Sequence, residues 1–337
     1  MSFLPKFLIQ LLLAFSLISV ATSAIQAQNQ RPKPSPTPSA AGQADQSERI
    51  FIRRVRLPIT VMDKKGQFVP GLSKSDFVVL EDKSPQQIET FFEDVGQTQQ
   101  LYVAVLMDTS PSTAGKLKFE QESAMNFIQT VVRPRKDRVA FATFDHDIAL
   151  KQDFTDKLDL LDRAVMGVKK LGTQTALYDA VWQFCDEKLR TAPGRRVIVV
   201  ISDGEDTYSR ADLRDAIDIA QRTETTVYAI STKAGLAGTV PGVRLGEVKD
   251  KSDNNLVKLS EETGGQAFFT GDMLALEQAF NKINKELRAQ YLVTYKPTND
   301  RYDGSFRRID VKLNGKGNYK VRTKHGYKAI ADAVGSQ

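Results

Sequence analysis

Two continuous apolar runs constrain the fold of this chain more than any other feature of its sequence. They span residues 101–107 and 196–202, and neither shows the polar alternation of a strand with one face in water. A strand of this kind must be buried on both faces, as happens where helices cover both sides of a parallel sheet. Segments with helical spacing separate these runs from further strand-like segments. The pattern predicts an α/β fold with a doubly wound, mainly parallel sheet.

The expected elements alternate over the region 99–289, as βαβ units require. The expected strands are 101–107, 138–144, 148–154, 196–202, 226–231 and 267–269, and the expected helices are 116–132, 157–171, 176–189, 211–222, 254–263 and 273–289. Residues 233–252 interrupt the alternation with four glycines and one proline, which favours a surface loop.

Strand-like segments also lie on both sides of this region. Residues 49–98 hold two apolar patches within 50–61, and two more strand-like stretches at 77–80 and 88–92. Residues 290–328 return to β character, with turn signals at Asp-Gly and Asn-Gly pairs. We expect the two segments to form a small β module together.

The first residues are typical of an export signal. Residues 1–27 combine a positive start, an apolar run and small residues suited to cleavage, which predicts a signal peptide. Residues 28–48 are rich in proline and small polar residues and predict a disordered linker. We expect 329–337 to be a frayed tail. No later stretch is apolar over the length of a membrane span, so we expect an exported, periplasmic or extracellular protein without a stable span after signal cleavage.

Composition excludes several classes of function. With 47 basic against 41 acidic residues, the net charge of +6 is too small and too scattered to indicate nucleic-acid binding. The single cysteine, Cys185, excludes an intramolecular disulfide, and its apolar neighbours predict a core position. Two distant histidines argue against a histidine-based zinc site.

Side-chain oxygens gather where two of the predicted central strands end. Asp108, Ser110 and Ser112 follow the first strand, and Asp203 follows the second. Thr175 lies between them in sequence, at the start of an expected helix. Because ligands of open parallel sheets bind beyond the carboxyl ends of the strands, we expect these five side chains to converge.

The chemistry of this set suits a hard divalent cation. Carboxylate and hydroxyl oxygens are ligands that Mg²⁺ accepts in proteins. Asp108 and Asp203 would balance the charge of a dication, and the hydroxyls would add none. The cation would then stay electrophilic and could accept one more carboxylate, such as an acidic side chain of a partner.

These positions together resemble the metal-ion-dependent adhesion site of von Willebrand factor type A domains. The likeness rests on the pattern Asp108-x-Ser110-x-Ser112, on Thr175 ahead of Ala-Leu-Tyr-Asp-Ala, and on Asp203 in Ser-Asp-Gly. The resemblance implies Mg²⁺, or sometimes Mn²⁺, as the cofactor. It also implies that Ser110 and Ser112 bind the metal directly, that Thr175 does so in ligand-bound forms, and that Asp108 and Asp203 act largely through water.

The resemblance extends over 99–289, and the order of segments widens it. A signal peptide, a proline-rich stretch, a short β module, the A domain and a β tail follow one another as in the VWFA-related proteins of bacteria, often acidobacteria. Residues 71–77 and 290–295 carry this wider likeness.

Several residues admit two interpretations. Thr173 competes with Thr175, because the family commonly has Gly-Gly-Thr where this chain has Gly-Thr-Gln-Thr. The Asp145-His146-Asp147 stretch reads as a polar hairpin turn or as a metal or acid–base pair, and we favour the turn.

Other residues near the expected site are also open. Glu205 and Asp206 either border the site or form a solvated acidic edge, which we favour. Asp179 either supports the site or is ordinary helix polarity. Trp182 and Phe184 are expected in the core.

No catalytic motif accompanies the predicted metal site. The sequence lacks a G-x-S-x-G elbow, a P-loop and a Cys–His pair, so we expect no catalytic residues and no enzyme. The resulting hypothesis is an exported module that binds a protein partner through an Asp or Glu of that partner and a bound Mg²⁺. The alternatives are a metal-dependent cell-envelope hydrolase and a structural envelope protein with a vestigial site.

Overall fold

The computed structural model describes residues 54–95, 99–113, 115–169, 171–233, 251–269, 273–315 and 319–330. The predicted signal peptide 1–27 and linker 28–48 lie outside these residues, as do most of the expected loop 233–252 and most of the tail 329–337.

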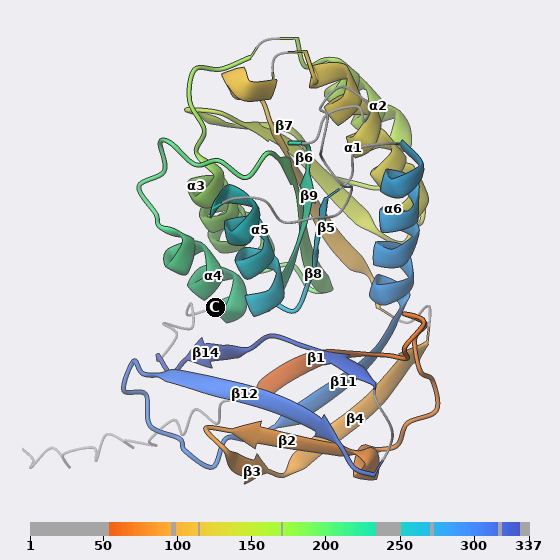
Figure 1. Ribbon diagram of the computed structural model, residues 1–337, viewed down its shortest axis with the longest axis vertical. Coiled ribbons are helices and arrows are strands. Elements are labelled where there is room, and N and C mark those ends of the chain that lie inside the picture. Colours follow the sequence, from red (N-terminus) through yellow and green to blue (C-terminus); the bar gives the residue numbers. More distant parts are fainter. Residues whose placement is uncertain are drawn as a thin grey trace, which may run out of the picture. The chain divides into compact units, whose positions relative to one another are not determined.

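The centre of the chain folds into a six-stranded sheet with the order β10-β9-β8-β5-β6-β7 (Figure 1). The strands are β5 (Leu101–Asp108), β6 (Arg138–Phe144), β7 (Ile148–Thr155), β8 (Arg195–Ser202), β9 (Thr225–Ser231) and β10 (Ala267–Phe269). All neighbouring pairs are parallel except β6 and β7, which are joined by a hairpin. The predicted doubly wound, mainly parallel sheet is confirmed.

Helices cover both faces of this sheet (Figure 1). They are α1 (Leu117–Val131), α2 (Leu158–Met166), α3 (Leu177–Gln183), α4 (Leu213–Arg222), α5 (Lys251–Glu262) and α6 (Met273–Arg288). Val103 and Val105 of β5 belong to a core shared with α1, α2 and α6, whereas Ala104 and Leu106 pack with α3, α4 and α5. Burial on both faces explains why β5 has no polar alternation.

Two helices differ from the sequence-based expectation. The helix expected at 157–171 ends at Met166, where the N–H of Gly167 donates to the carbonyl of Arg163 and the chain leaves the helix. The helix expected at 176–189 changes after α3 into a π-helical turn, Phe184–Leu189. Trp182 was expected in the core but is 41% exposed, since the buried side of this helix carries Phe184 and its neighbours.

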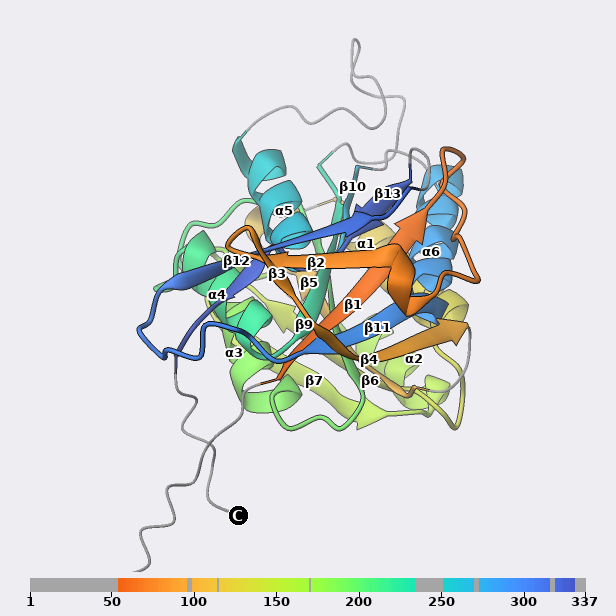
Figure 2. The ribbon, with the colours of Figure 1, turned by 90° about the horizontal axis from the view of Figure 1, so that it is seen from below.

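The flanking segments form two further four-stranded sheets, with the orders β13-β1-β11-β4 and β14-β12-β2-β3. Their strands are β1 (Val55–Met62), β2 (Phe77–Glu81), β3 (Ser84–Gln86), β4 (Ile88–Val95), β11 (Ala289–Tyr295), β12 (Phe306–Leu313), β13 (Lys320–Arg322) and β14 (Gly326–Lys328). Both sheets mix strands from before and after the central domain and share one apolar core. The expected β module from N- and C-terminal segments is confirmed, and Figure 2 shows its strands in the foreground.

The two apolar patches expected within 50–61 correspond to a single described strand, β1. Pro58 lies inside it, opposite Leu292 of β11. A proline lacks the N–H that a second neighbouring strand would need. The strand tolerates it because β13 pairs with β1 only from Thr60 onward.

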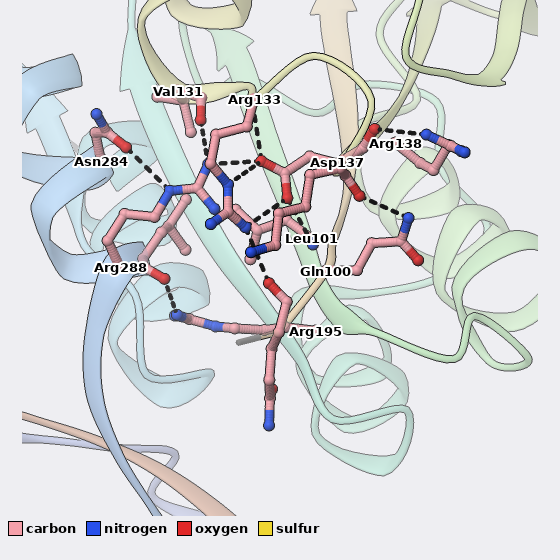
Figure 3. A network of polar contacts seen from close by, with 12 residues as sticks. Gln100, Leu101, Val131, Arg133, Asp137, Arg138, Arg195, Asn284 and Arg288 are labelled. Carbon is pink, nitrogen blue, oxygen red and sulfur yellow. Dashed lines mark hydrogen bonds and ion pairs between the residues drawn. The ribbon is translucent and has the colours of Figure 1, made fainter. Parts of the chain in front are cut away.

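A polar network joins the start of β5 to the ends of α1 and α6 (Figure 3). Its centre is the buried Asp137, whose carboxylate accepts hydrogen bonds from the backbone N–H of Leu101 and from the guanidinium groups of Arg133 and Arg288. Burial alone would raise the pKa of Asp137, but these bonds outweigh it and lower the pKa to about 2. Arg288 also donates to the carbonyl of Val131.

Helix α6 leads directly into the β module, because Arg288 is its last residue and Ala289 is the first of β11. Near this junction the guanidinium of Arg322 in β13 lies 2.7 Å from the carboxylate of Glu286 in α6. A second ion pair joins Arg56 of β1 to Glu224, ahead of β9, at 3.6 Å. The β module therefore contacts the central domain at the end of the central sheet where the parallel strands begin.

Candidate metal centre

The loops that follow β5 and β8 meet at the opposite end of the sheet, beyond the carboxyl ends of the strands. The two strands are parallel neighbours, with Met107 opposite Ile201. The hydroxyl of Ser202 donates to Oδ2 of Asp108 at 2.6 Å. The last residue of one strand is thus bonded to the last residue of the other, which fixes the two loops against each other.

The first loop turns its oxygens toward one another. The N–H of Ser110 donates to Oδ1 of Asp108 at 2.8 Å, and the hydroxyls of Ser110 and Ser112 lie 3.0 Å apart. Asp108 and Ser110 are buried, whereas Ser112 is exposed. The loop therefore presents a buried carboxylate behind a pair of hydroxyls, of which the outer one faces solvent.

Burial dominates the electrostatics of Asp108. Its pKa is raised to about 6 by desolvation, and the nearby carboxylate of Asp203 adds to the rise. Hydrogen bonds from Ser110 and Ser202 act in the opposite direction. A bound cation would favour the charged form of such a carboxylate. Two carboxylates and a hydroxyl pair at one buried edge are a donor set that fits a hard divalent cation.

The Thr175 segment is bonded to both neighbouring loops. The N–H of Gly172 donates to the carbonyl of Thr109 at 2.7 Å. The N–H of Thr175 donates to the hydroxyl of Thr207 at 3.0 Å, and its carbonyl accepts from the N–H groups of Thr207 and Tyr208. Thr175 is buried, while Thr173 is exposed. Of the two threonines, Thr175 is the buried one whose backbone is bonded to the loop after β8, and its role as a metal ligand stays a prediction.

The Asp145-His146-Asp147 stretch is the turn between β6 and β7, as the sequence favoured. Its first residue, Asp145, also supports the site, which the sequence did not indicate. The carbonyl of Asp145 accepts from the N–H of Ala176 at 2.8 Å, and its Oδ2 accepts from the hydroxyl of Thr109 at 3.1 Å. His146 lies between the two carboxylates, with Nδ1 2.6 Å from Asp145 and Nε2 3.2 Å from Asp147.

A glycine allows this close approach. A Cβ atom on Gly172 would lie 2.1 Å from the Cγ of Asp145, so the side chain of Asp145 occupies the space that any other residue at 172 would need. The turn after β6 and the Thr175 segment can therefore lie against each other only because residue 172 has no side chain.

The loop after β8 depends on a second glycine. Gly204 has a φ of +81°, and a Cβ there would lie 2.8 Å from the side chain of Leu256. Its N–H donates to the hydroxyl of Ser202, and the N–H of Glu205 donates to Oδ1 of Asp203 at 3.2 Å. Positive φ and close packing both require glycine at 204, next to Asp203.

Acidic residues near α3 hold this loop in place. Asp179 accepts from the N–H groups of Arg210 and Ala211, so it supports the loop and is more than ordinary helix polarity. Asp206 accepts from the hydroxyl of Ser209 at 2.6 Å and is partly buried. Burial raises the pKa of Asp206. The solvated edge that we favoured therefore describes the exposed Glu205 but not Asp206.

Glu120, a buried acid of α1 near the site, was not predicted from the sequence. One of its oxygens accepts from the hydroxyl of Thr232 at 2.9 Å, and the other is buried without a hydrogen-bond partner among the described residues. Burial raises the pKa of Glu120 to about 9, and Asp108 and Asp203 contribute to the rise. The sequence held one signal of its burial: Glu120 lies four residues before Ala124, on the apolar side of helix α1.

Within the described ranges, no group of three or more His, Cys, Asp or Glu side chains could hold a metal ion. A metal at this edge would therefore depend on the hydroxyls of Ser110, Ser112 and Thr175 as well as on two carboxylates. The sequence predicted this donor set, and it stays a prediction.

Comparison with known proteins identifies the family. The family model of the von Willebrand factor type A domain matches residues 103–282, which is more than half of the chain. The chain belongs to this family. The A domain thus occupies the six-stranded sheet and its helices, and the resemblance seen in the sequence is confirmed at the level of the family. No curated protein matches the chain significantly.

The solved structures that this chain is similar to match it at low sequence identity. The A domain of Mfa5, the type V pili tip protein of Porphyromonas gingivalis, is 14% identical, covers 57% of this chain and 96% of its own, and has a TM-score of 0.43. An aerotolerance-related membrane protein from Bacteroides fragilis is 16% identical, with coverages of 56% and 98% and a TM-score of 0.44. Proximal thread matrix protein 1 from the mussel byssus is 15% identical, with coverages of 61% and 51% and a TM-score of 0.47. At this identity the assignment rests on the family match.

Membership of the family indicates a general role. Von Willebrand factor type A domains are protein-interaction modules, so this chain contains one. Within the part of the chain that the structure describes, no helix is long and apolar enough to span a bilayer.

Proposed function

We propose that this chain is an exported protein-interaction module that binds an acidic side chain of a partner through a divalent cation, with Mg²⁺ as the preferred ion. The proposed ligands are Asp108, Ser110, Ser112, Thr175 and Asp203. One observation carries the proposal: the carboxylate of Asp108 is buried at the end of β5, tied to Ser202 of β8, and lies behind the paired hydroxyls of Ser110 and Ser112.

The side chains of this site have distinct tasks in the proposal. The cation, when bound, supplies an electrophilic centre that attracts a carboxylate from outside. Asp108 and Asp203 provide the negative charge that holds it at the edge of the sheet. The exposed hydroxyl of Ser112 marks the side from which a partner reaches the site. Asp145 and Asp179 position the Thr175 segment and the loop after β8, and neither needs to touch the ion.

Export remains a prediction from residues 1–27, which lie outside the described residues. Within the proposal the signal peptide directs the chain to the periplasm or the cell exterior, and the linker 28–48 separates the folded part from the membrane. The proposed boundaries are 49–98 and 290–328 for the β module and 99–289 for the A domain.

The partner is tested by affinity capture with the folded chain in Mg²⁺ and in EDTA. We expect a partner that is retained in Mg²⁺, lost in EDTA and lost with Asp108→Ala. Asp147→Ala is the matched control, because Asp147 is an exposed acid at the same edge of the sheet and is not a proposed ligand. Replacing one Asp or Glu of the captured partner should abolish retention. A partner retained equally in EDTA would favour the vestigial-site alternative.

The hydrolase alternative is tested separately. Screening for turnover of cell-envelope substrates with Mg²⁺ or Mn²⁺ would support it if activity appeared and was lost in Asp203→Ala. The proposal predicts no turnover.

A further inference from the structure

A groove lies between α6 and the turn that follows β1, at the junction of the A domain and the β module. Its volume is about 460 Å³, which is within the range of ligand sites. One wall is formed by 65–68 and the other by 278–286, with Met62 of β1 among the lining residues. The proposed metal site is at the carboxyl end of the sheet, whereas the residues that line this groove belong to α6, to β1 and to the turn after β1, near the junction with the β module.

Local bonding fixes the wall formed by the turn. Oδ1 of Asp63 accepts from the N–H groups of Lys65 and Gln67, each at 2.8 Å. Phe68 forms an isolated antiparallel bridge with Met62, and its ring stacks on Tyr291 of β11 with centroids 5.3 Å apart. One side of the groove is therefore a turn fixed by hydrogen bonds, next to the half-buried ring of Phe68.

The rims of the groove are positively charged. Lys65 lies on the turn and Lys285 on α6, and both are exposed. Lys282 lines the groove as well, and its ammonium donates to Oε1 of Gln266 at 3.0 Å. Burial lowers the pKa of Lys282, and the nearby charges of Arg322 and Lys320 lower it further, against the opposing effect of Glu286. The exposed ammonium groups of Lys65 and Lys285 therefore supply the positive charge at the rims.

One acidic group lies within this basic groove. Glu286 is 4% exposed, and its Oε2 lies 2.7 Å from the guanidinium of Arg322. Its Oε1 is buried and has no hydrogen-bond partner among the described residues. Because this oxygen has almost no accessible surface, the charge of Glu286 is held inside the wall beside Arg322 and is not offered to a bound molecule.

We propose that this groove is a second binding site, which takes a short acidic peptide segment of a partner protein with an apolar side chain among its carboxylates. The carboxylates pair with the exposed Lys65 and Lys285, and the apolar side chain lies against the half-buried ring of Phe68. A peptide offers both groups within a few residues. A sulfated glycan offers the negative charge but not the apolar side chain.

The test uses fluorescence anisotropy with the folded chain and a short labelled peptide of glutamates around a central leucine. We expect saturable binding that is weakened by about tenfold or more in the double variant Lys65→Glu, Lys285→Glu. Both lysines are exposed, so the variant should fold. Lys258→Glu is the matched control, because it reverses an exposed lysine on α5 and should leave the affinity unchanged.

Further arms separate this site from the metal site and from a glycan site. Binding that persists in EDTA and in Asp108→Ala supports the groove, whereas binding lost under either condition would place the peptide at the metal site. An equal loss of peptide affinity in Lys258→Glu would show that the effect comes from the overall charge of the protein and not from the groove. Replacing the central leucine with serine should weaken binding. Tighter binding of a sulfated tetrasaccharide than of the peptide would overturn the proposed ligand class.

Discussion

The hydroxyl of Ser202 donates to Oδ2 of Asp108 across 2.6 Å, and this bond joins the ends of the two central strands, β8 and β5. Oδ1 of the same carboxylate accepts the N–H of Ser110. Both oxygens of Asp108 are therefore oriented before any ion arrives. Groups that orient a ligand in this way affect metal affinity without touching the metal.

Ser202→Ala should therefore lower Mg²⁺ affinity by roughly 10–100-fold, the range found when the supporting partner of a metal ligand is removed. Calorimetric titration of both proteins measures the change. Ser260→Ala is a suitable control, because it removes a buried hydroxyl of α5 that has no hydrogen-bond partner among the described residues. Equal affinities of Ser202→Ala and the wild type would show that this bond does not prepare the site.

Thr175→Ala and Thr173→Ala should differ. Thr175 is buried at the site and bonded to Thr207, whereas Thr173 is exposed. We expect partner retention in Mg²⁺ to fall by about tenfold in Thr175→Ala and to stay unchanged in Thr173→Ala. A loss of retention in Thr173→Ala, with none in Thr175→Ala, would assign the metal ligand of this segment to Thr173, the alternative that the sequence left open.

Glu120→Gln should stabilise the metal-free protein at neutral pH. The pKa of Glu120 is raised from 4.5 to about 9 in the folded state. Folding then keeps a proton that the unfolded chain releases, so the stability contribution is full below pH 4.5 and falls as pH rises toward 9. At pH 7, keeping this proton lowers the free energy of unfolding of the wild type by about 3 kcal/mol, and glutamine at position 120 avoids this loss.

Urea unfolding in EDTA at two pH values measures this effect. We expect Glu120→Gln and the wild type to differ little at pH 4.5 and the variant to be more stable at pH 7. A stability difference that does not change with pH would show that Glu120 is not protonated in the folded protein.

Asp137→Asn should destabilise the protein, because it leaves Arg133 and Arg288 without their buried partner. The pKa of Asp137 falls from 3.8 to about 2 in the folded state, so its contribution is present above pH 3.8 and is lost as pH falls through about 2. We expect a loss of about 2–3 kcal/mol at pH 7, measured by urea unfolding.

The control for this variant is Asp159→Asn. Asp159 pairs with Arg163 at 3.0 Å, but both side chains are about two-thirds exposed. An exposed pair contributes roughly 0–1 kcal/mol. A similar loss in both variants would contradict the special role of the network in Figure 3.

The sequence predicted the fold because burial leaves a direct trace in residue type. β5 and β8 are buried on both faces, and their continuous apolar runs indicate this burial without reference to the rest of the chain. Trp182 was misplaced because residue type indicates average burial, while its side chain lies on the outward face of α3.

The candidate site was only partly visible in sequence. Asp108, Ser110, Ser112 and Asp203 lie in short motifs after β5 and β8, and Thr175 lies just ahead of α3, so their order and spacing were enough to propose them as ligands. Ser202 is hydrogen-bonded to Asp108, which lies 94 positions away in the sequence. Asp206 is bonded to Tyr178 across 28 positions, and Glu120 is bonded to Thr232 across 112 positions. Such contacts follow from sheet order and helix packing, which a single sequence does not specify.

Calorimetric titration of Mg²⁺ into the folded wild type and into Asp108→Ala shows most directly whether the metal binds at this edge of the sheet. We predict saturable binding at one site per chain in the wild type and none in Asp108→Ala, with Asp147→Ala behaving like the wild type. Binding that is equal in the wild type and Asp108→Ala would contradict the assignment of the metal to this edge of the sheet.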